Sequence, residues 1–166
     1  MDAIRERILR TSGLTFTAIE AGEGPTILCL HGFPDTRHTY EGVARRWAEA
    51  GYRVVAPQLR GYEHSSDPGN GDFYLETLAT DVIGWIEELG DQKVHLVGHD
   101  WGAPIAYAAA ALAPHTRTPR APPPRRGTRR EMSTAIRAHD GHLGDEEHHW
   151  RCGTCKEWVN FFGSVS

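Results

Sequence analysis

The amino-acid sequence predicts an α/β fold in which a mostly parallel sheet is flanked by helices. Three short apolar runs, residues 26–30, 53–56 and 94–97, have the composition of strands that are buried on both faces. Stretches with helical periodicity lie between and after these runs, and strands that alternate with helices at this spacing form parallel sheets. A change of composition near Pro114 ends both patterns, so the fold is predicted for residues 1–113.

The first predicted elements are two strands of a hairpin. Residues 4–11 and 14–21 are strand-like, and the Ser12-Gly13 pair between them is typical of a turn. Residues 26–30 then form the first buried strand.

A helix and a second buried strand are predicted next. The helix covers about residues 39–50, because its apolar positions share one face and Gly51 follows as a stop signal. Residues 53–56 form the strand, which Pro57 closes.

The periodicity is most regular over residues 75–89, where apolar side chains recur at spacings of three and four. This pattern predicts an amphipathic helix that ends at Gly90. Residues 94–97 form the third buried strand. The small, apolar residues of 102–113 favour a helix that packs closely against the sheet.

The two parts of the chain differ in charge and composition. Residues 1–113 carry nine Lys and Arg against sixteen Asp and Glu, a net charge of −7, and form the predicted partial core. Residues 114–166 carry nine against six, a net charge of +3, and are first rich in Pro and Arg and then contain His and Cys. We expect this second part to be an irregular, largely disordered tail. Its only apolar cluster comprises Trp158, Val159, Phe161 and Phe162.

A soluble, cytoplasmic protein without membrane contacts is expected from three observations. The sequence has no apolar run long enough to span a bilayer, and its N-terminal segment lacks the apolar stretch of a secretory signal. Its three cysteines, Cys29, Cys152 and Cys155, do not make a disulfide framework.

Residues 98–102, Gly-His-Asp-Trp-Gly, predict a nucleophile elbow with Asp100 as the attacking group. Side chains at Gly98 and Gly102 would collide with neighbouring backbone in so tight a turn between strand and helix. The N-terminus of the following helix keeps the Asp100 carboxylate ionised, as a nucleophile requires. Aspartate suits attack on an sp3 carbon, because the ester that forms can later be cleaved by water. A simple Gly-x-Asp-x-Gly turn is the alternative, but the flanking apolar strand and helix favour the elbow.

A second motif, His31-Gly32-Phe33-Pro34, directly follows the first buried strand. The two motifs together resemble the α/β-hydrolase fold family, in the branch of epoxide hydrolases and haloalkane or haloacid dehalogenases. The resemblance implies that the backbone N–H groups of Phe33 and Trp101 form an oxyanion hole. It also implies a cis Phe33-Pro34 bond.

The resemblance covers residues 5–113, the N-terminal portion of an α/β-hydrolase fold. The segment 53–66 is similar to the family's fourth-strand region, with two departures: Gln58 stands where Asp is usual, and Glu63 where Gly is usual. The Trp101 side chain either holds a leaving halide or lines an apolar pocket. Hydrogen-bonded structural roles, rather than base catalysis, are predicted for His31 and His99. The residues that support the loop and the elbow are His31, Gly32, Pro34, Gly98, His99 and Gly102.

The general base and its acid partner are not recognisable in the sequence. The family places a His and an acid, together with a substrate-positioning lid, downstream of the elbow, and residues 114–166 show no strand pattern that would carry them. The tail contains several histidines, none of which can be assigned: His115, His139, His142, His148 and His149.

Metal and nucleic-acid binding are weaker interpretations of the tail. Cys152 and Cys155, with His148 and His149, have zinc-knuckle spacing, but one CxxC is a weak signal. The basic, Pro-rich stretch lacks the interleaved aromatic residues of a nucleic-acid interface. We therefore expect no metal, no cofactor and no nucleic-acid partner.

Three functional hypotheses remain. The first is a hydrolase of epoxides or halogenated compounds, acting on a small molecule through an aspartyl ester of Asp100. The second is an inactive, truncated or frameshifted hydrolase fragment, and the third is a metal-binding or interaction module in the tail. Substrate choice is undecided, and the incomplete sheet predicts self-association. If a frameshift caused the break, the coding DNA near codon 114 continues with a family-like apolar strand in another frame.

Overall fold

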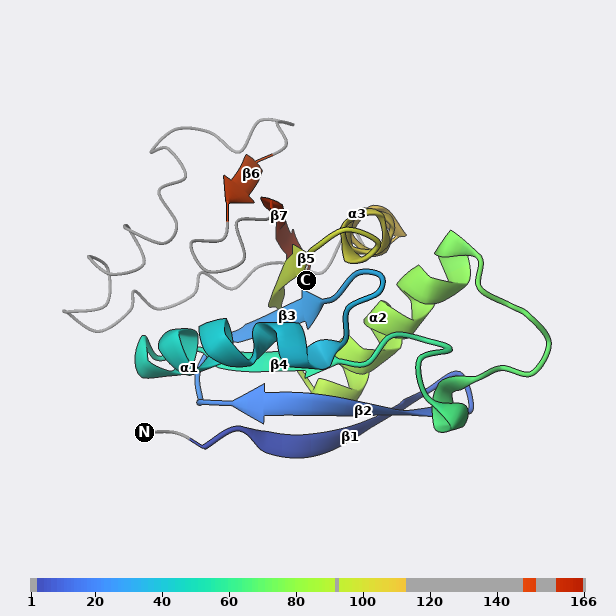
Figure 1. Cartoon of the computed structure of the whole chain (residues 1–166), viewed down its shortest axis with the longest axis horizontal. Coiled ribbons are helices and arrows are strands. Elements are labelled where there is room, and N and C mark those ends of the chain that lie inside the picture. Colours follow the sequence, from blue (N-terminus) through green and yellow to red (C-terminus); the bar gives the residue numbers. More distant parts are fainter. Residues whose placement is uncertain (1–2, 92, 113–147, 152–157, 166) are drawn as a thin grey trace.

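The computed structural model describes residues 3–91, 93–112, 148–151 and 158–165 (Figure 1). Within them, one seven-stranded sheet has the order β1-β2-β4-β3-β5-β7-β6. In chain order the elements are β1 (Arg5–Thr11), β2 (Leu14–Ala21), β3 (Thr26–Leu30), η1 (Arg37–Tyr40), α1 (Glu41–Glu49), β4 (Arg53–Pro57), η2 (His64–Ser66), α2 (Leu75–Leu89), β5 (Val94–Gly98), α3 (Gly102–Leu112), β6 (His148–Arg151) and β7 (Trp158–Val165).

The predicted hairpin is confirmed. Strands β1 and β2 pair antiparallel, with Leu9 opposite Phe16. Ser12 and Gly13 between them have φ values of 53° and 75°. Two consecutive residues with positive φ match the right-handed twist of the strands they join, as in a type I′ hairpin turn.

The centre of the sheet is parallel, and its flanks are antiparallel. Strand β3 pairs in parallel with β4 and with β5, and Leu30 stands opposite Gly98. The other pairings are antiparallel, because a hairpin lies at one side and the β6–β7 pair at the other. The sheet is therefore mixed, whereas the sequence predicted a mostly parallel one. The parallel register brings the carboxyl ends of β3 and β5 to the same edge.

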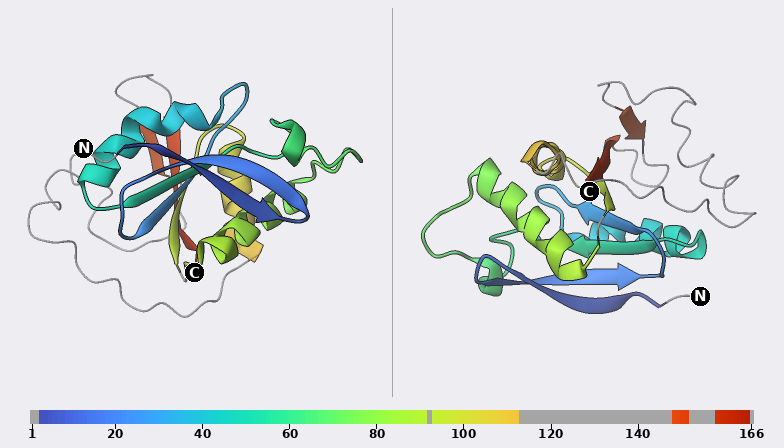
Figure 2. Two further views of the ribbon diagram at one scale, coloured as in Figure 1. Left: turned by 90° about the horizontal axis from the view of Figure 1, so that it is seen from below. Right: turned by 180° about the vertical axis from the view of Figure 1, so that it is seen from behind.

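Helices cover both faces of the sheet, as predicted, with α1 on one face and α2 and α3 on the other (Figure 2). The two cores reflect the alternation of side chains along a strand. On β3, Ile27 and Cys29 pack towards the α1 residues Ala44 and Ala48. Leu28 and Leu30 belong to the opposite core, with the side chains of α2 and α3.

The helices end close to the predicted positions. Helix α2 ends at Leu89, and Gly90 follows in the left-handed conformation with φ 72°. Helix α1 begins at Glu41, because the residues before it form the short 3-10 helix η1. The predicted last residue of α3, Ala113, lies outside the described residues.

Two strands occur in the part of the chain for which an irregular tail was expected. Strand β7 pairs antiparallel with β5, and Asn160 stands opposite Gly98. The physical reason is that β7 contains the apolar C-terminal cluster and pairs the backbone groups of β5 that would otherwise form an open edge. The remainder of the tail, residues 113–147, 152–157 and 166, lies outside the described residues.

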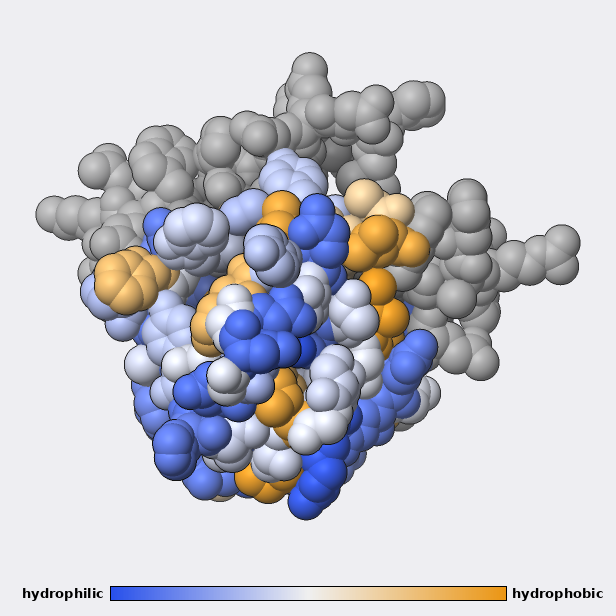
Figure 3. Space-filling model, turned by 90° about the vertical axis from the view of Figure 1, so that its right-hand side faces the viewer, coloured by the Kyte–Doolittle hydropathy of each residue, from blue (hydrophilic) through white to orange (hydrophobic). Residues whose placement is uncertain are grey.

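The α-helices of the described residues are α1, α2 and α3. None of these helices combines the length and apolar character that crossing a bilayer requires. On the side shown in Figure 3, hydrophobic surface occurs as separate patches between hydrophilic areas.

Candidate active site

The turn from β5 into α3 is sterically tight. Asp100 lies in it with φ 51°, a left-handed conformation that few residues other than glycine adopt. A Cβ atom at Gly98 would lie 2.5 Å from the Gly102 carbonyl oxygen, and one at Gly102 would lie 2.1 Å from the Leu30 carbonyl oxygen. Both flanking positions therefore need glycine, for the steric reason that the sequence suggested.

The loop of residues 31–37 lies directly against this turn, and it is called the oxyanion loop because it contains Phe33 of the predicted oxyanion hole. A Cβ atom at Gly32 would come within 2.4 Å of the Asp100 Cβ atom. The Phe33-Pro34 peptide bond is cis, as the family resemblance predicted. The backbone N–H of Phe33 donates a hydrogen bond of 2.9 Å to Asp100 Oδ1. The structure thus brings the two predicted motifs together at one carboxylate.

The electrostatics of the turn favour the ionised form of Asp100. The hydrogen bond from the Phe33 N–H lowers the pKa of this carboxyl group most strongly. Partial burial opposes this effect, while the Trp101 N–H and the charge of His99 lower the pKa further. The sequence predicted ionisation from the position of Asp100 at a helix N-terminus, and the Phe33 N–H is a further cause that the sequence did not show. The Asp100 side chain is exposed, so an ionised carboxylate faces solvent.

Both residues of the predicted oxyanion hole present their backbone to Asp100 and their rings to solvent. The Phe33 side chain is 69% exposed and that of Trp101 is 61% exposed. Large exposed apolar rings beside a carboxylate can hold an apolar small molecule against it.

His31 occupies a buried position behind the loop. The Leu59 N–H donates to His31 Nε2 at 3.0 Å, so Nε2 carries no proton. The other nitrogen, Nδ1, therefore donates to the Gly32 carbonyl oxygen at 2.9 Å. Burial lowers the pKa of His31, with the Gly32 hydrogen bond acting in the opposite direction. Both ring nitrogens are thus engaged within the fold, which supports the structural role predicted for this histidine.

His99 connects the elbow to β3 and to the oxyanion loop. Its backbone N–H donates to the Leu30 carbonyl oxygen at 3.0 Å. Its ring Nδ1 lies 3.8 Å from Asp35 Oδ2. These contacts support the predicted structural role of His99.

The sequence assigned no role in the site to Tyr62, to Glu63 or to the loop residue Arg37. The Tyr62 ring lies edge-on to His31 with centroids 4.7 Å apart, and its hydroxyl donates to the Gly32 carbonyl oxygen at 3.3 Å. Arg37 and Glu63 also meet here, at 3.0 Å between Nη1 and Oε1. The sequence analysis noted Glu63 as a departure from the family pattern. Its contact with Arg37 could not be predicted from a local pattern, because the two residues are 26 positions apart.

The general base stays unassigned, and the zinc-knuckle interpretation of the tail stays untested. Among the described residues no group of three or more metal-ligating side chains occurs. His148 and His149 belong to β6, whereas Cys152 and Cys155 lie outside the described residues. The other tail histidines, His115, His139 and His142, lie outside them as well.

These features, a strand-turn-helix elbow and an adjoining oxyanion loop on a mixed sheet, define a class of protein. The chain belongs to the α/β hydrolase fold family, whose model matches residues 25–116. It is a hydrolase by ancestry.

The relatives of the chain include proteins that are named epoxide hydrolases. The chain is 38% identical over 117 residues to an AB hydrolase superfamily protein of Bacillus subtilis, covering 69% of this chain. It is 41% identical over 112 residues to an epoxide hydrolase of Caballeronia sordidicola, covering 67% of this chain. The crystal structure of an epoxide hydrolase from Vigna radiata is 35% identical to this chain, with a TM-score of 0.64. The match covers 67% of this chain and 35% of the Vigna radiata chain.

The chain is much shorter than these curated relatives. It spans 41% of the length of the Bacillus protein and 34% of the Caballeronia enzyme.

Proposed function

We propose that the Asp100 carboxylate attacks an epoxide and forms a covalent aspartyl ester. The observation that carries this proposal is the geometry of the elbow: an exposed carboxylate in a left-handed turn that accepts a hydrogen bond from the Phe33 N–H. The names of the relatives support an epoxide as substrate.

In the first step, an Asp100 oxygen forms a bond to one carbon of the epoxide ring. The bond between that carbon and the ring oxygen breaks, and the resulting alkoxide takes a proton from water. The product is a hydroxyalkyl ester of Asp100. Relief of ring strain drives this step, and the low pKa of the carboxyl group keeps the nucleophile ionised.

In the second step, water adds to the carbonyl carbon of the ester and loses a proton to a base or to solvent. The carbonyl oxygen becomes an oxyanion beside the N–H groups of Phe33 and Trp101. In acyl transfer such donors are worth about 10²–10³ in rate. The intermediate then releases a diol and restores the carboxylate. One oxygen of the diol has come from Asp100.

The described residues favour a second candidate function, because they supply the first step more completely than the second. The first step needs only residues of the elbow and the oxyanion loop. The second step needs a base, which no described residue is proposed to supply. The alternative is therefore a single alkylation of Asp100 without turnover.

The test is a reaction with a panel of epoxides and halocarboxylates, followed by mass analysis of the intact chain and of the products. Product accumulating over many turnovers supports the hydrolase, while a single adduct mapped to Asp100 supports the stoichiometric alternative. In H2¹⁸O, the first turnover should leave ¹⁸O in the protein and ¹⁶O in the diol.

Two variants make the result specific to Asp100. Asp100→Asn keeps the shape of the side chain and tolerates the positive φ, so loss of reaction reports loss of the nucleophile. Asp67→Asn removes an exposed carboxylate outside the elbow and the oxyanion loop, one that accepts a hydrogen bond from the Gly69 N–H, and this variant should react normally at Asp100. Absence of both adduct and product in the unmodified chain would refute the proposal.

A further inference from the structure

The segment of residues 58–63, directly after β4, contacts the oxyanion loop along its length. The Leu59 N–H reaches His31, and the Tyr62 hydroxyl reaches the Gly32 carbonyl oxygen. At the far end of the loop, the backbone N–H of Arg37 donates to Gln58 Oε1 at 3.1 Å. The loop that presents the Phe33 N–H is thus held from one side by a single segment.

The Arg37 side chain strengthens the contact at the far end of the loop. Its Nη1 donates to Glu63 Oε1 at 3.0 Å and to Gln58 Oε1 at 3.4 Å. The side chains of Arg37 and Glu63 are only 13% and 19% exposed. An ion pair with this degree of burial is screened less by solvent than a surface pair. A third partner, Glu6 on β1, is 71% exposed and contributes less.

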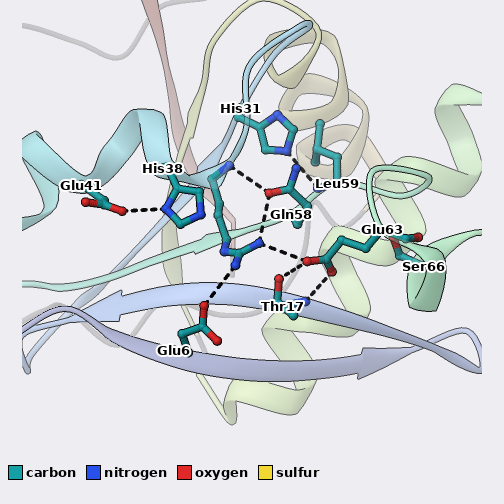
Figure 4. Close-up of polar contacts among 10 residues, drawn as sticks. Glu6, Thr17, His31, His38, Glu41, Gln58, Leu59, Glu63 and Ser66 are labelled. Atoms are coloured by element: carbon teal, nitrogen blue, oxygen red, sulfur yellow. Dashed lines mark hydrogen bonds and ion pairs between the residues drawn. The ribbon is translucent and has the colours of Figure 1, made fainter.

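Glu63 is in turn fixed to the sheet. Its carboxylate accepts hydrogen bonds from the backbone N–H of Thr17, at 2.9 Å, and from the Thr17 hydroxyl. The Thr17 carbonyl oxygen accepts a hydrogen bond of 2.7 Å from the Gln58 N–H. One residue of β2 therefore holds both ends of segment 58–63. Figure 4 shows Glu6 and Thr17 on the two strands of the hairpin. Gln58 and Glu63 belong to the segment that follows β4.

We propose that Arg37 and Glu63 are positioning residues, which hold the oxyanion loop so that the Phe33 N–H meets Asp100. Hydrogen bonds connect β2 to Glu63 and Glu63 to Arg37. The backbone of the loop then connects Arg37 to Phe33, whose N–H donates to Asp100. The two departures from the family pattern, Gln58 and Glu63, thereby acquire one explanation, because both accept hydrogen bonds from Arg37.

The decisive variant is Glu63→Ala, read out by NMR titration of the Asp100 carboxyl group and by the amide signal of Phe33. Removing a negative charge by itself stabilises other carboxylates and would lower the Asp100 pKa. Loosening the loop weakens the Phe33 hydrogen bond and raises that pKa. The two effects have opposite signs, so a rise in the Asp100 pKa with a displaced Phe33 amide signal supports positioning. An unchanged or lowered pKa overturns it.

Glu41→Ala is the matched control. Glu41 on α1 pairs with His38 and Arg45, so this variant removes the same charge from a neighbouring element without touching segment 58–63. We expect it to leave the Phe33 amide signal in place and not to raise the Asp100 pKa. A rise of equal size in both variants would overturn the proposal.

The rate of adduct formation on Asp100 is a second readout, and it rests on the proposed function. A fall of about tenfold in Glu63→Ala is expected, below the roughly 100-fold that a misplacement of 1 Å costs. If the unmodified chain forms no adduct, the proposed function fails, while the titration still decides the positioning role. Should Glu63→Ala not fold, Arg37→Met is titrated in its place against Arg45→Met, and an Asp100 pKa that rises no further than in Arg45→Met overturns the proposal.

Discussion

Asp100 adopts a backbone conformation that aspartate tolerates better than most residues, at a cost of order 1 kcal/mol. The surrounding backbone enforces this conformation, since β5 and α3 approach so closely that Gly98 and Gly102 have no room for a side chain. The result is an exposed carboxylate that accepts a hydrogen bond from the Phe33 N–H. A small local strain thus presents the proposed nucleophile to solvent.

The close approach of the oxyanion loop to Asp100 can be tested at Gly32. A Cβ atom there would overlap the Asp100 side chain, so Gly32→Ala should displace one of the two and destabilise the fold by about 1–3 kcal/mol. Adduct formation should be lost even in the folded fraction. Thermal unfolding and intact mass measure the two effects.

The control for this substitution is Gly42→Ala. Gly42 lies in α1, where a Cβ atom would meet nothing within 4 Å. Alanine favours the helix, so stability should be unchanged or rise by up to about 1 kcal/mol. Equal effects of both substitutions would contradict the steric explanation.

The pH dependence of the reaction follows from the lowered pKa of Asp100. The carboxylate is the reactive form and is present above its pKa. The rate of adduct formation should therefore stay constant as the pH falls from 8 to about 5, and should decline only below the ordinary aspartate value of about 3.9. Initial rates at constant ionic strength measure the profile, and a decline between pH 7 and 5 would contradict it.

At the scale of elements, a buried carboxylate joins the hairpin to the centre of the sheet. Glu20 on β2 is 2% exposed, and its oxygens lie 2.7 Å from Arg53 Nε on β4 and 3.2 Å from Arg7 Nη1 on β1. Burial by itself raises the pKa of Glu20. Hydrogen bonds from Arg5, Arg53 and Arg7 outweigh burial and bring the pKa to about 2. Arginines of β1 and β4 thus both contact the single negative charge of Glu20 on β2.

This cluster predicts a loss of stability in acid. The pKa of Glu20 is about 2 in the folded chain, below the ordinary glutamate value of 4.5 that we take for the unfolded chain. Its contribution is therefore complete above about pH 4.5 and is lost as the pH falls towards 2, to an extent of about 1–2 kcal/mol, because the Arg5 side chain is 63% exposed and solvent screens its charge. Urea unfolding of Glu20→Gln should show a lower stability at pH 7 and a smaller further loss at pH 3 than the unmodified chain.

Glu23→Gln serves as the comparison, because Glu23 is an exposed glutamate in the loop that follows β2. It should unfold like the unmodified chain at both pH values. If Glu20→Gln behaves in the same way, the arginine cluster does not stabilise the sheet.

At the scale of the whole molecule, β7 closes the side of the sheet at which β5 would otherwise end it. Phe161 stands opposite Val97 on β5 and opposite His148 on β6. Proline has no N–H to donate, so Phe161→Pro should interrupt the pairing of β7 and expose an unpaired edge. Sedimentation velocity should then show more self-association than in the unmodified chain. A monomer at all concentrations would contradict the predicted role of β7.

Much of the core was predictable because its signals are local. The helix over 75–89 and the strand at 26–30 were predicted with the bounds that the structure shows. The elbow could be recognised because its glycines and its aspartate lie within five consecutive residues. The apolar cluster near the C-terminus was recognised, but its pairing with β5 was not. That pairing depends on an edge about 60 residues earlier in the chain.

The sequence alone determined the alternation of strands and helices, the hairpin, and the identity of the carboxylate at the elbow. These depend on periodicity, turn residues and steric limits that act over a few positions. Only the tertiary structure decided that Phe33 reaches Asp100, and that Arg37 joins Gln58 to Glu63. Such contacts join residues that are 21 to 67 positions apart. They follow from strand register and loop packing, which no local pattern encodes. The elbow could therefore be recognised in the sequence, whereas the hydrogen bonds that position the loop beside Asp100 could not.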